Sequence, residues 1–365
     1  MTNAVVQLMG ITHSQMNLKD RALGCIFAGG CGDALGYPVE HKKWAAILDM
    51  YGPSGICTME TKNGVAIITD DTQMTIYTAQ GLIHAFQKHC SVDDTVKEVH
   101  KSYLRWYISL MHSETITPHL YAALYPEEEL LQNDLLQDGK YAGLDTKMCR
   151  GGSTFEALES GEMYTVDHRA PSGVRCGCTM RAAPIAVAYH SNPEEAFKMG
   201  CACAALTHGV RSAFLSAGVM CMLIAKLLNG TEAMEAVEST LAYLANVPKS
   251  EALLRVLKKG VELGKNPRDC AHDDISSIGL GWRADENLAI ALYCLVRYKK
   301  DIRSALIACV NHDGDSDSVG AVCGNIMGSY AGVESIPKEW LDVLQFRDLL
   351  ELQVNTICSY TEKAT

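Results

Sequence analysis

Two acidic clusters, far apart in the chain, hold the residues with the clearest capacity for chemistry. The first is Thr69-Asp70-Asp71-Thr72, and the second is Asp313-Gly314-Asp315-Ser316-Asp317-Ser318. Each stands directly before an apolar stretch with helical periodicity, so either one alone could be an ordinary helix cap. Together they supply enough carboxylate and hydroxyl oxygens for two divalent cations, because hard cations prefer oxygen ligands. A metal-dependent hydrolase is therefore the first hypothesis.

Six residues of the two clusters form the predicted metal site. Aspartates at a helix N-terminus meet the positive end of the helix dipole and unpaired N–H groups, so we expect them to stay ionised. Neighbouring carboxylates with no lysine or arginine between them would repel one another strongly without a cation. This argument holds only if the two clusters meet in space. The predicted ligands are Thr69, Asp70, Asp71, Asp315, Asp317 and Ser318.

Two familiar motifs are excluded by spacing. The run from Asp313 to Ser318 lacks the glycine at the sixth position of an EF-hand calcium loop, and Gly324 stands where that loop needs its final glutamate. Gly30, Gly32 and Gly36 do not form a dinucleotide-binding fingerprint, because no strand precedes them and the last glycine comes one residue late.

Most of the chain from Leu18 onward has helical periodicity, which predicts an all-α fold. One strand-like run, 64–69, is the exception. No linker rich in proline, glycine and serine divides the chain, so we expect an N-terminal extension at 1–17 followed by one domain at 18–358. The expected helices are 71–89, 93–110, 178–189, 194–206, 210–228, 231–245, 250–264, 284–298, 301–310, 316–331 and 338–356.

Glycine and alanine recur every fourth residue in two of the helical segments. The first stripe is Gly24, Ala28, Gly32 and Gly36, and the second runs from Gly320 to Gly332 in the same four-residue steps. A four-residue repeat follows one face of a helix, and glycine in a helix interior costs about 1 kcal/mol relative to alanine. We expect the two helices to be central and to pack against each other, bringing the residue after Gly32, Asp33, close to the second acidic cluster. A broken segment is the alternative for the first stripe, at its adjacent glycines.

Composition bounds the class of protein. The chain has 365 residues, 48% hydrophobic and 21% charged, with a net charge of −11, which suits a packed globular protein and argues against nucleic acid as a partner. Its 15 cysteines lie singly in apolar stretches or as C-x-C pairs, so we expect reduced thiols and a cytoplasmic location. No signal peptide is evident, and the apolar run 213–225 is too short to span a membrane, so a membrane partner is not expected.

The residues of these motifs, in this order, resemble the ADP-ribosylglycohydrolase family. The resemblance runs from Leu18 to Leu352 and is carried by Gly32-Asp33-Ala34-Leu35-Gly36-Tyr37-Pro38-Val39-Glu40, by the two acidic clusters and by the second glycine stripe. Four shorter segments add to it: Arg150–Thr154, Gly177–Arg181, Leu206–His208 and Gly279–Trp282. The family includes dinitrogen-reductase-activating glycohydrolases and the ADP-ribosyl-arginine and ADP-ribosyl-serine hydrolases.

The resemblance implies a compact orthogonal bundle of helices around a two-metal site, with Mg²⁺ or Mn²⁺ as the two divalent cations. It implies hydrolysis of the bond that joins ADP-ribose to a protein side chain. Glu40 matches a glutamate near the metals in serine-directed relatives, and Asp71, Asp317 and Glu40 are the catalytic candidates for orienting or deprotonating the attacking water. The implied substrate-binding residues are Asp33, Gly152, Ser153, Gly173, Gly177, Cys178, His208 and Trp282.

Three functions remain open from the sequence. We prefer an arginine-directed hydrolase acting on an ADP-ribosylated protein, because the second cluster and the Gly-x-Gly-Trp segment look closer to arginine-directed relatives. A hydrolase of serine-linked ADP-ribose is the nearest alternative. A different class is an immunity protein whose residues 1–17 block an ADP-ribosyltransferase toxin, and a pseudoenzyme is disfavoured by the intact set of six ligands.

Overall fold

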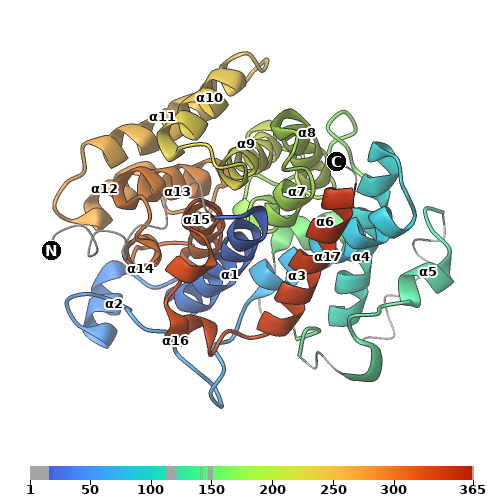
Figure 1. Cartoon of the computed structure of the whole chain (residues 1–365), viewed down its shortest axis with the longest axis horizontal. Coiled ribbons are helices and arrows are strands. Elements are labelled where there is room, and N and C mark those ends of the chain that lie inside the picture. Colours follow the sequence, from blue (N-terminus) through green and yellow to red (C-terminus); the bar gives the residue numbers. More distant parts are fainter. Residues whose placement is uncertain are drawn as a thin grey trace, which may run out of the picture.

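The computed structural model describes residues 16–111, 121, 123–139, 141, 143–146 and 151–363. Over these ranges the chain forms α-helices and short 3-10 turns with isolated bridges instead of a sheet, which confirms the predicted all-α fold (Figure 1). The extension predicted at 1–17, apart from its last two residues, and Arg150 lie outside the described residues. A role for the extension therefore stays a prediction.

The α-helices are α1 (Leu18–Gly36), α2 (Trp44–Tyr51), α3 (Asp70–Gln87), α4 (Val92–Met111), α5 (Glu127–Leu131), α6 (Gly152–Glu159), α7 (Ala183–Ala188), α8 (Pro193–Ala205), α9 (Arg211–Leu228), α10 (Ala233–Ala245), α11 (Glu251–Lys265), α12 (Ala271–Ile278), α13 (Ala284–Tyr298), α14 (Ile302–Val310), α15 (Ser316–Ala331), α16 (Lys338–Leu341) and α17 (Arg347–Lys363). The 3-10 turns are η3 (Tyr37–Val39), η5 (Gln137–Gly139), η6 (Cys176–Cys178) and η7 (Val333–Ser335).

Helices α1 and α15 lie side by side at the centre of the bundle (Figure 1). A Cβ atom added to Gly324 would lie 2.0 Å from the carbonyl oxygen of Ala28, so the two backbones touch where the glycine stripes meet. Gly32 faces Gly320 in the same way, while the start of α1 meets the end of α15. The helices are therefore antiparallel. The predicted central pairing is confirmed, and the alternative of a broken first stripe is wrong, because the stripe lies inside α1.

This pairing decides where the acidic clusters go. Because α1 and α15 are antiparallel, the C-terminal end of α1 meets the N-terminal end of α15, where Asp317 lies in the first turn. Helix α3 contacts both helices and begins at the first acidic cluster. The condition on which the metal-site prediction depended, that the two clusters meet, is fulfilled by the packing.

Three predicted elements are corrected by the structure. The strand predicted at 64–69 is wrong: the segment makes two isolated bridges, from Val65 to Lys62 and from Ala66 to Leu344, and otherwise runs as a loop. The helix predicted at 178–189 begins only at Ala183, because η6 occupies the preceding residues. The helix predicted at 338–356 is two helices, α16 and α17, separated by a turn that ends at Phe346. The φ of Phe346 is 55°, which is a left-handed value that a right-handed helix cannot accommodate.

Helix α9 is long and apolar enough to cross a membrane by length and composition alone. It packs against α8, α13 and α15, and most of its residues are buried inside the bundle. A helix that is apolar all round and enclosed by other helices is typical of a protein core. We therefore interpret α9 as a core helix on the evidence of its burial, whereas the expectation that this apolar stretch is too short to span a membrane is wrong, because the helix runs over 18 residues.

Candidate functional site

The first acidic cluster is held in place by a single buried carboxylate, Asp33 of α1. Its oxygens accept hydrogen bonds from the backbone N–H and the hydroxyl of Thr69, at 3.0 and 2.8 Å, and from the backbone N–H of Thr72 at 3.1 Å. The Thr69 hydroxyl in turn accepts from the N–H of Asp71 and caps α3. Asp33 therefore fixes the turn from which Asp70 and Asp71 project.

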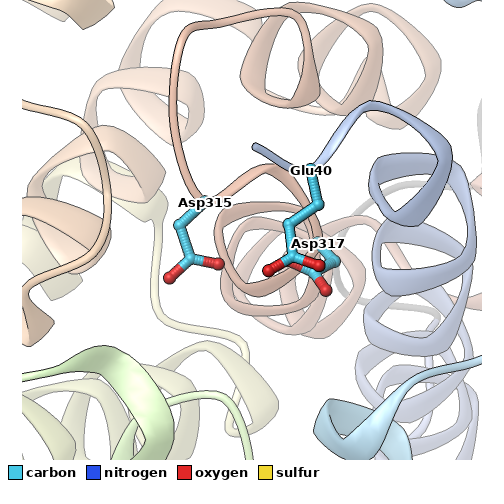
Figure 2. A group of neighbouring side chains, drawn as sticks. All are labelled: Glu40, Asp315 and Asp317. Carbon is cyan, nitrogen blue, oxygen red and sulfur yellow. The ribbon is translucent and has the colours of Figure 1, made fainter. Parts of the chain in front are cut away.

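Three carboxylates from two segments meet at the end of the α1–α15 pair. One oxygen each of Glu40, Asp315 and Asp317 lies within 4.8 Å of the others. Figure 2 shows the three side chains turned toward a common space, with Glu40 reaching in from the segment after η3 and the aspartates from the start of α15. Asp70 and Asp71 line the same cavity. Glu40, predicted as a catalytic residue, thus belongs to the carboxylate cluster itself.

The electrostatics of the cluster differ from the expectation. Burial, reinforced by the carboxylate of Asp33, raises the pKa of Asp70 to about 7. Burial and neighbouring carboxylates also raise the pKa of Asp71 and of Asp317 well above the ordinary value. The expectation that the helix N-termini keep these groups ionised is wrong for the protein alone, because desolvation and like-charge repulsion outweigh the helix dipole.

The residues present fit a divalent cation. Oδ1 of Asp71 is buried and has no hydrogen-bond partner among the described residues, although a buried carboxylate oxygen is costly to leave unpaired. Asp71 lines a cavity that also carries four other carboxylates, and a cation bound there would lower the repulsion and could satisfy the unpaired oxygen. The five carboxylates are Glu40, Asp70, Asp71, Asp315 and Asp317.

The cavity holds about 650 Å³ of empty space and opens between α6, η6 and the loop before α13. The first residues of α6 line the cavity, and no described side chain caps this helix, so its first N–H groups are available to a ligand as far as the described residues show. The exposed Arg175 adds a positive charge. A negative floor and a positive, N–H-rich opening are thus built into one cavity.

His208 is placed at this opening as a neutral hydrogen-bond donor. Burial lowers the pKa of His208 well below its usual range. Arg181, itself buried, donates to the Thr207 hydroxyl, whose oxygen also lies within hydrogen-bond distance of Nδ1 of His208, at 2.8 Å. With Nδ1 accepting from Thr207, Nε2 would carry the ring proton on the side of the ring that approaches Gly177 of the cavity wall.

An aromatic pair closes one side of the opening. The rings of His41 and Trp282 stack at 4.6 Å, and the guanidinium of Arg175 lies 5.9 Å from the Trp282 ring centre. His41 also places Nε2 3.0 Å from Oε1 of Glu40. The aromatic wall is therefore connected directly to the carboxylate floor.

Most, but not all, of the predicted site residues reach the cavity. All the predicted catalytic and metal residues line it except Thr69, which caps α3 behind the floor. Asp33 supports that floor from the core, Gly173 packs on His208, and the Cys178 thiol faces the carbonyl of Ala213. The remaining predicted substrate residues line the cavity: Gly152, Ser153, Gly177, His208 and Trp282.

Sequence reasoning missed several lining residues. Three of them lie inside the segments Arg150–Thr154 and Gly177–Arg181, which carried the family resemblance, so a signal was present although no role was assigned to them. Arg175 and Cys176 lie between the predicted residues Gly173 and Gly177. The missed residues are His41, Gly151, Thr154, Arg175, Cys176 and Met180.

Comparisons with known proteins agree with this fold and show the family of the chain. The sequence profile described as ADP-ribosylglycohydrolase matches residues 14–364, and the chain belongs to this family of hydrolases of ADP-ribose linkages. The chain is similar to an uncharacterised protein of Archaeoglobus fulgidus, with 24% identity over 92% of this chain and 94% of that protein.

Two further kinds of similarity support less, because one covers only part of the relatives and the other shows the fold alone. ADP-ribosylhydrolase ARH3 of Bos taurus and of Homo sapiens is each 24% identical over 189 residues, which is 45% of this chain and 52% of the relative. The chain thus spans about half the length of these relatives. A solved structure described as an ADP-ribosylglycohydrolase-related protein complex has a TM-score of 0.64 at 23% identity, over 94% of this chain and 99% of that one, which supports the fold.

Proposed function

We propose that this protein is a divalent-cation-dependent hydrolase that removes ADP-ribose from modified protein side chains, with arginine as the preferred acceptor. The observation that carries the proposal is the division of the cavity. The cavity gathers five carboxylates, one of which has a buried oxygen without a partner among the described residues, and it is also lined by Arg175, by His208 and by the N-terminus of α6, which no described side chain caps. Family membership supplies the ADP-ribose part of the substrate.

The opening suits a diphosphate. Helix N-termini bind anions because their N–H groups are unpaired and the dipole favours negative charge. Gly152 and Ser153 of α6 present such groups to the cavity, and Arg175 adds a full positive charge beside them. A diphosphate bound there would direct the attached ribose toward the carboxylate floor, away from solvent.

The floor suits the reacting end of the substrate. When bound, divalent cations supply Lewis-acid polarisation of the bond that breaks and of the attacking water. Asp71, Asp317 and Glu40 would hold the cations or orient the attacking water. Hydrolysis then transfers the ribose carbon from the acceptor side chain to water and leaves free ADP-ribose.

The preference for arginine rests on the residues that would contact the modified side chain where it leaves the cavity. A guanidinium is recognised by carboxylates and by the faces of aromatic rings. Glu40 and the indole of Trp282 lie together on one side of the opening, joined by His41. A serine acceptor needs neither partner, so this arrangement favours arginine over the serine-linked alternative.

The test uses matched peptides that carry ADP-ribose on arginine or on serine, each incubated with Mg²⁺, with Mn²⁺ or with EDTA. We expect ADP-ribose release from the arginine-linked peptide that requires a cation. Asp317→Asn should abolish release, because it removes a charge from the floor without changing the side-chain volume. Asp301→Asn is the matched control, because Asp301 is an exposed N-cap of α14 and caps equally well as asparagine.

Different results overturn different parts of the proposal. Full activity in EDTA, or in Asp317→Asn, would remove the cation-dependent mechanism. Release from the serine-linked peptide alone would replace arginine by serine as the acceptor. Failure to release ADP-ribose from either peptide, with Mg²⁺ binding intact, would exclude both acceptors.

A further inference from the structure

A thiol lies among the carboxylates of the cavity floor. Sγ of Cys176 donates a hydrogen bond to Oδ2 of Asp315 over 2.8 Å, and Cys176 also hydrogen-bonds the side chain of Ser318. Cys176 is 6% exposed and lines the cavity together with Asp71 and Asp317. The sulfur therefore occupies the position of one more donor atom in the predicted cation site.

The other half of the C-x-C pair has ordinary core surroundings. Sγ of Cys178 lies 3.4 Å from the backbone oxygen of Ala213 of α9, and Cys178 does not line the cavity. A buried cysteine usually serves as a small apolar side chain. Cys178 fits that description, whereas Cys176, with carboxylate and hydroxyl neighbours, does not.

A second observation shows that this part of the cavity is short of a ligand. Asp71 is 3% exposed and lines the same cavity, and its Oδ1 is buried without a hydrogen-bond partner among the described residues. Sγ of Cys176 and Oδ2 of Asp315 lie 2.8 Å apart, so one cation in the cavity could contact both atoms.

We propose that Cys176 is a sulfur ligand of the floor, and that the floor therefore binds thiophilic divalent cations such as Zn²⁺, Co²⁺ or Cd²⁺ more tightly than Mg²⁺. Thiolate ligands favour such cations, whereas carboxylates alone suit Mg²⁺ and Mn²⁺. Binding forms a sulfur–metal bond and releases the thiol proton to solvent. This proposal rests on the cation site of the proposed function. It adds the Cys176 sulfur as a ligand, which would favour thiophilic cations over Mg²⁺.

The test is a titration of the metal-free, full-length protein with Co²⁺, followed by absorption spectroscopy. Wild type should develop a thiolate-to-cobalt charge-transfer band in the near ultraviolet, and excess Mg²⁺ should remove it by competition. Cys176→Ser should lose the band and bind Co²⁺ at least about tenfold more weakly, because even an outer partner of a ligand typically contributes 10–100-fold in affinity. Cys178→Ser is the matched control and should keep the band.

Asp315→Asn provides a second variant that leaves every thiol in place, and it should weaken the band as well. The proposal is overturned if wild type shows no thiolate band, if the band survives in Cys176→Ser, or if Mg²⁺ does not compete. Mg²⁺-dependent ADP-ribose release without a cobalt–thiolate band would leave the proposed function standing and remove the sulfur ligand. A Cys176-dependent band in a protein that hydrolyses no ADP-ribose linkage would do the reverse.

Discussion

Replacing Asp70 by asparagine should stabilise the metal-free protein at alkaline pH, although it removes a predicted ligand. Asp70 is buried and lies near Asp33, Glu40 and Asp315, and together burial and these charges raise its pKa from 3.8 to about 7. Asparagine has the same shape without the charge. The substitution therefore removes a desolvated negative charge from the floor at nearly constant packing.

The magnitude follows from the two pKa values. Because the folded-state pKa of Asp70 is the higher one, folding binds a proton, and stability is lost as pH rises from about 4 through about 7. A pKa rise of about 3 pH units, at about 1.36 kcal/mol per unit, corresponds to a cost on the order of 4 kcal/mol at pH 8. At pH 5 the same group costs only on the order of 2 kcal/mol.

The assay is urea unfolding in EDTA, monitored by far-ultraviolet circular dichroism at pH 5 and pH 8. We expect Asp70→Asn to gain stability at both pH values and more at pH 8, while Asp301→Asn changes little at either, because asparagine and aspartate are equivalent N-caps. Saturating Mg²⁺ should reverse the order, since ligand binding stabilises the protein that binds it. Equal or lower stability of metal-free Asp70→Asn at pH 8 would refute the reasoning that the floor carries unrelieved repulsion.

Two further predictions concern the packing and the opening of the cavity. Gly324→Ala should destabilise the protein by about 2 kcal/mol or more in thermal or urea unfolding, because the new Cβ meets backbone atoms at 2.0 Å. Gly30→Ala in the facing helix meets only a leucine side chain at 3.4 Å and should be neutral or stabilising, since alanine favours the helix by about 1 kcal/mol. Thr207→Val should weaken ADP-ribose binding, measured by calorimetry, by about fivefold to tenfold, because it removes the hydroxyl that orients His208, a net hydrogen-bond contribution of about 1 kcal/mol.

Each of these has a result that would contradict it. Equal stability of the Gly324→Ala and Gly30→Ala variants would mean that the α1–α15 contact can open at little cost. Thr207→Ser keeps the hydroxyl and should retain binding. If Thr207→Ser binds as weakly as Thr207→Val, the hydrogen bond to His208 does not position the ring.

Local periodicity predicted most of the helices, and it failed where tertiary contacts decide the backbone. The segment 64–69 has the alternation of a strand, but its bridges to Lys62 and Leu344 stay isolated, because no strand pairs with it among the residues that the structure describes. The break between α16 and α17 at Phe346 is likewise invisible to periodicity, because the apolar residues on both sides keep a helical spacing. Both errors concern pairing or chain direction, which local pattern does not encode.

The sequence by itself determined the helical architecture, the central pairing of the two glycine stripes and the identity of the carboxylates on the cavity floor. Each of these depends on residue type and on spacing within one segment. Only the tertiary structure decided that Glu40 joins Asp315 and Asp317, that Asp33 supports the floor from behind, and that Cys176 faces the carboxylates while Cys178 faces the core. These are contacts between residues distant in the chain, and the direction of a side chain follows from how backbones pack, which the antiparallel contact of α1 with α15 sets for this site.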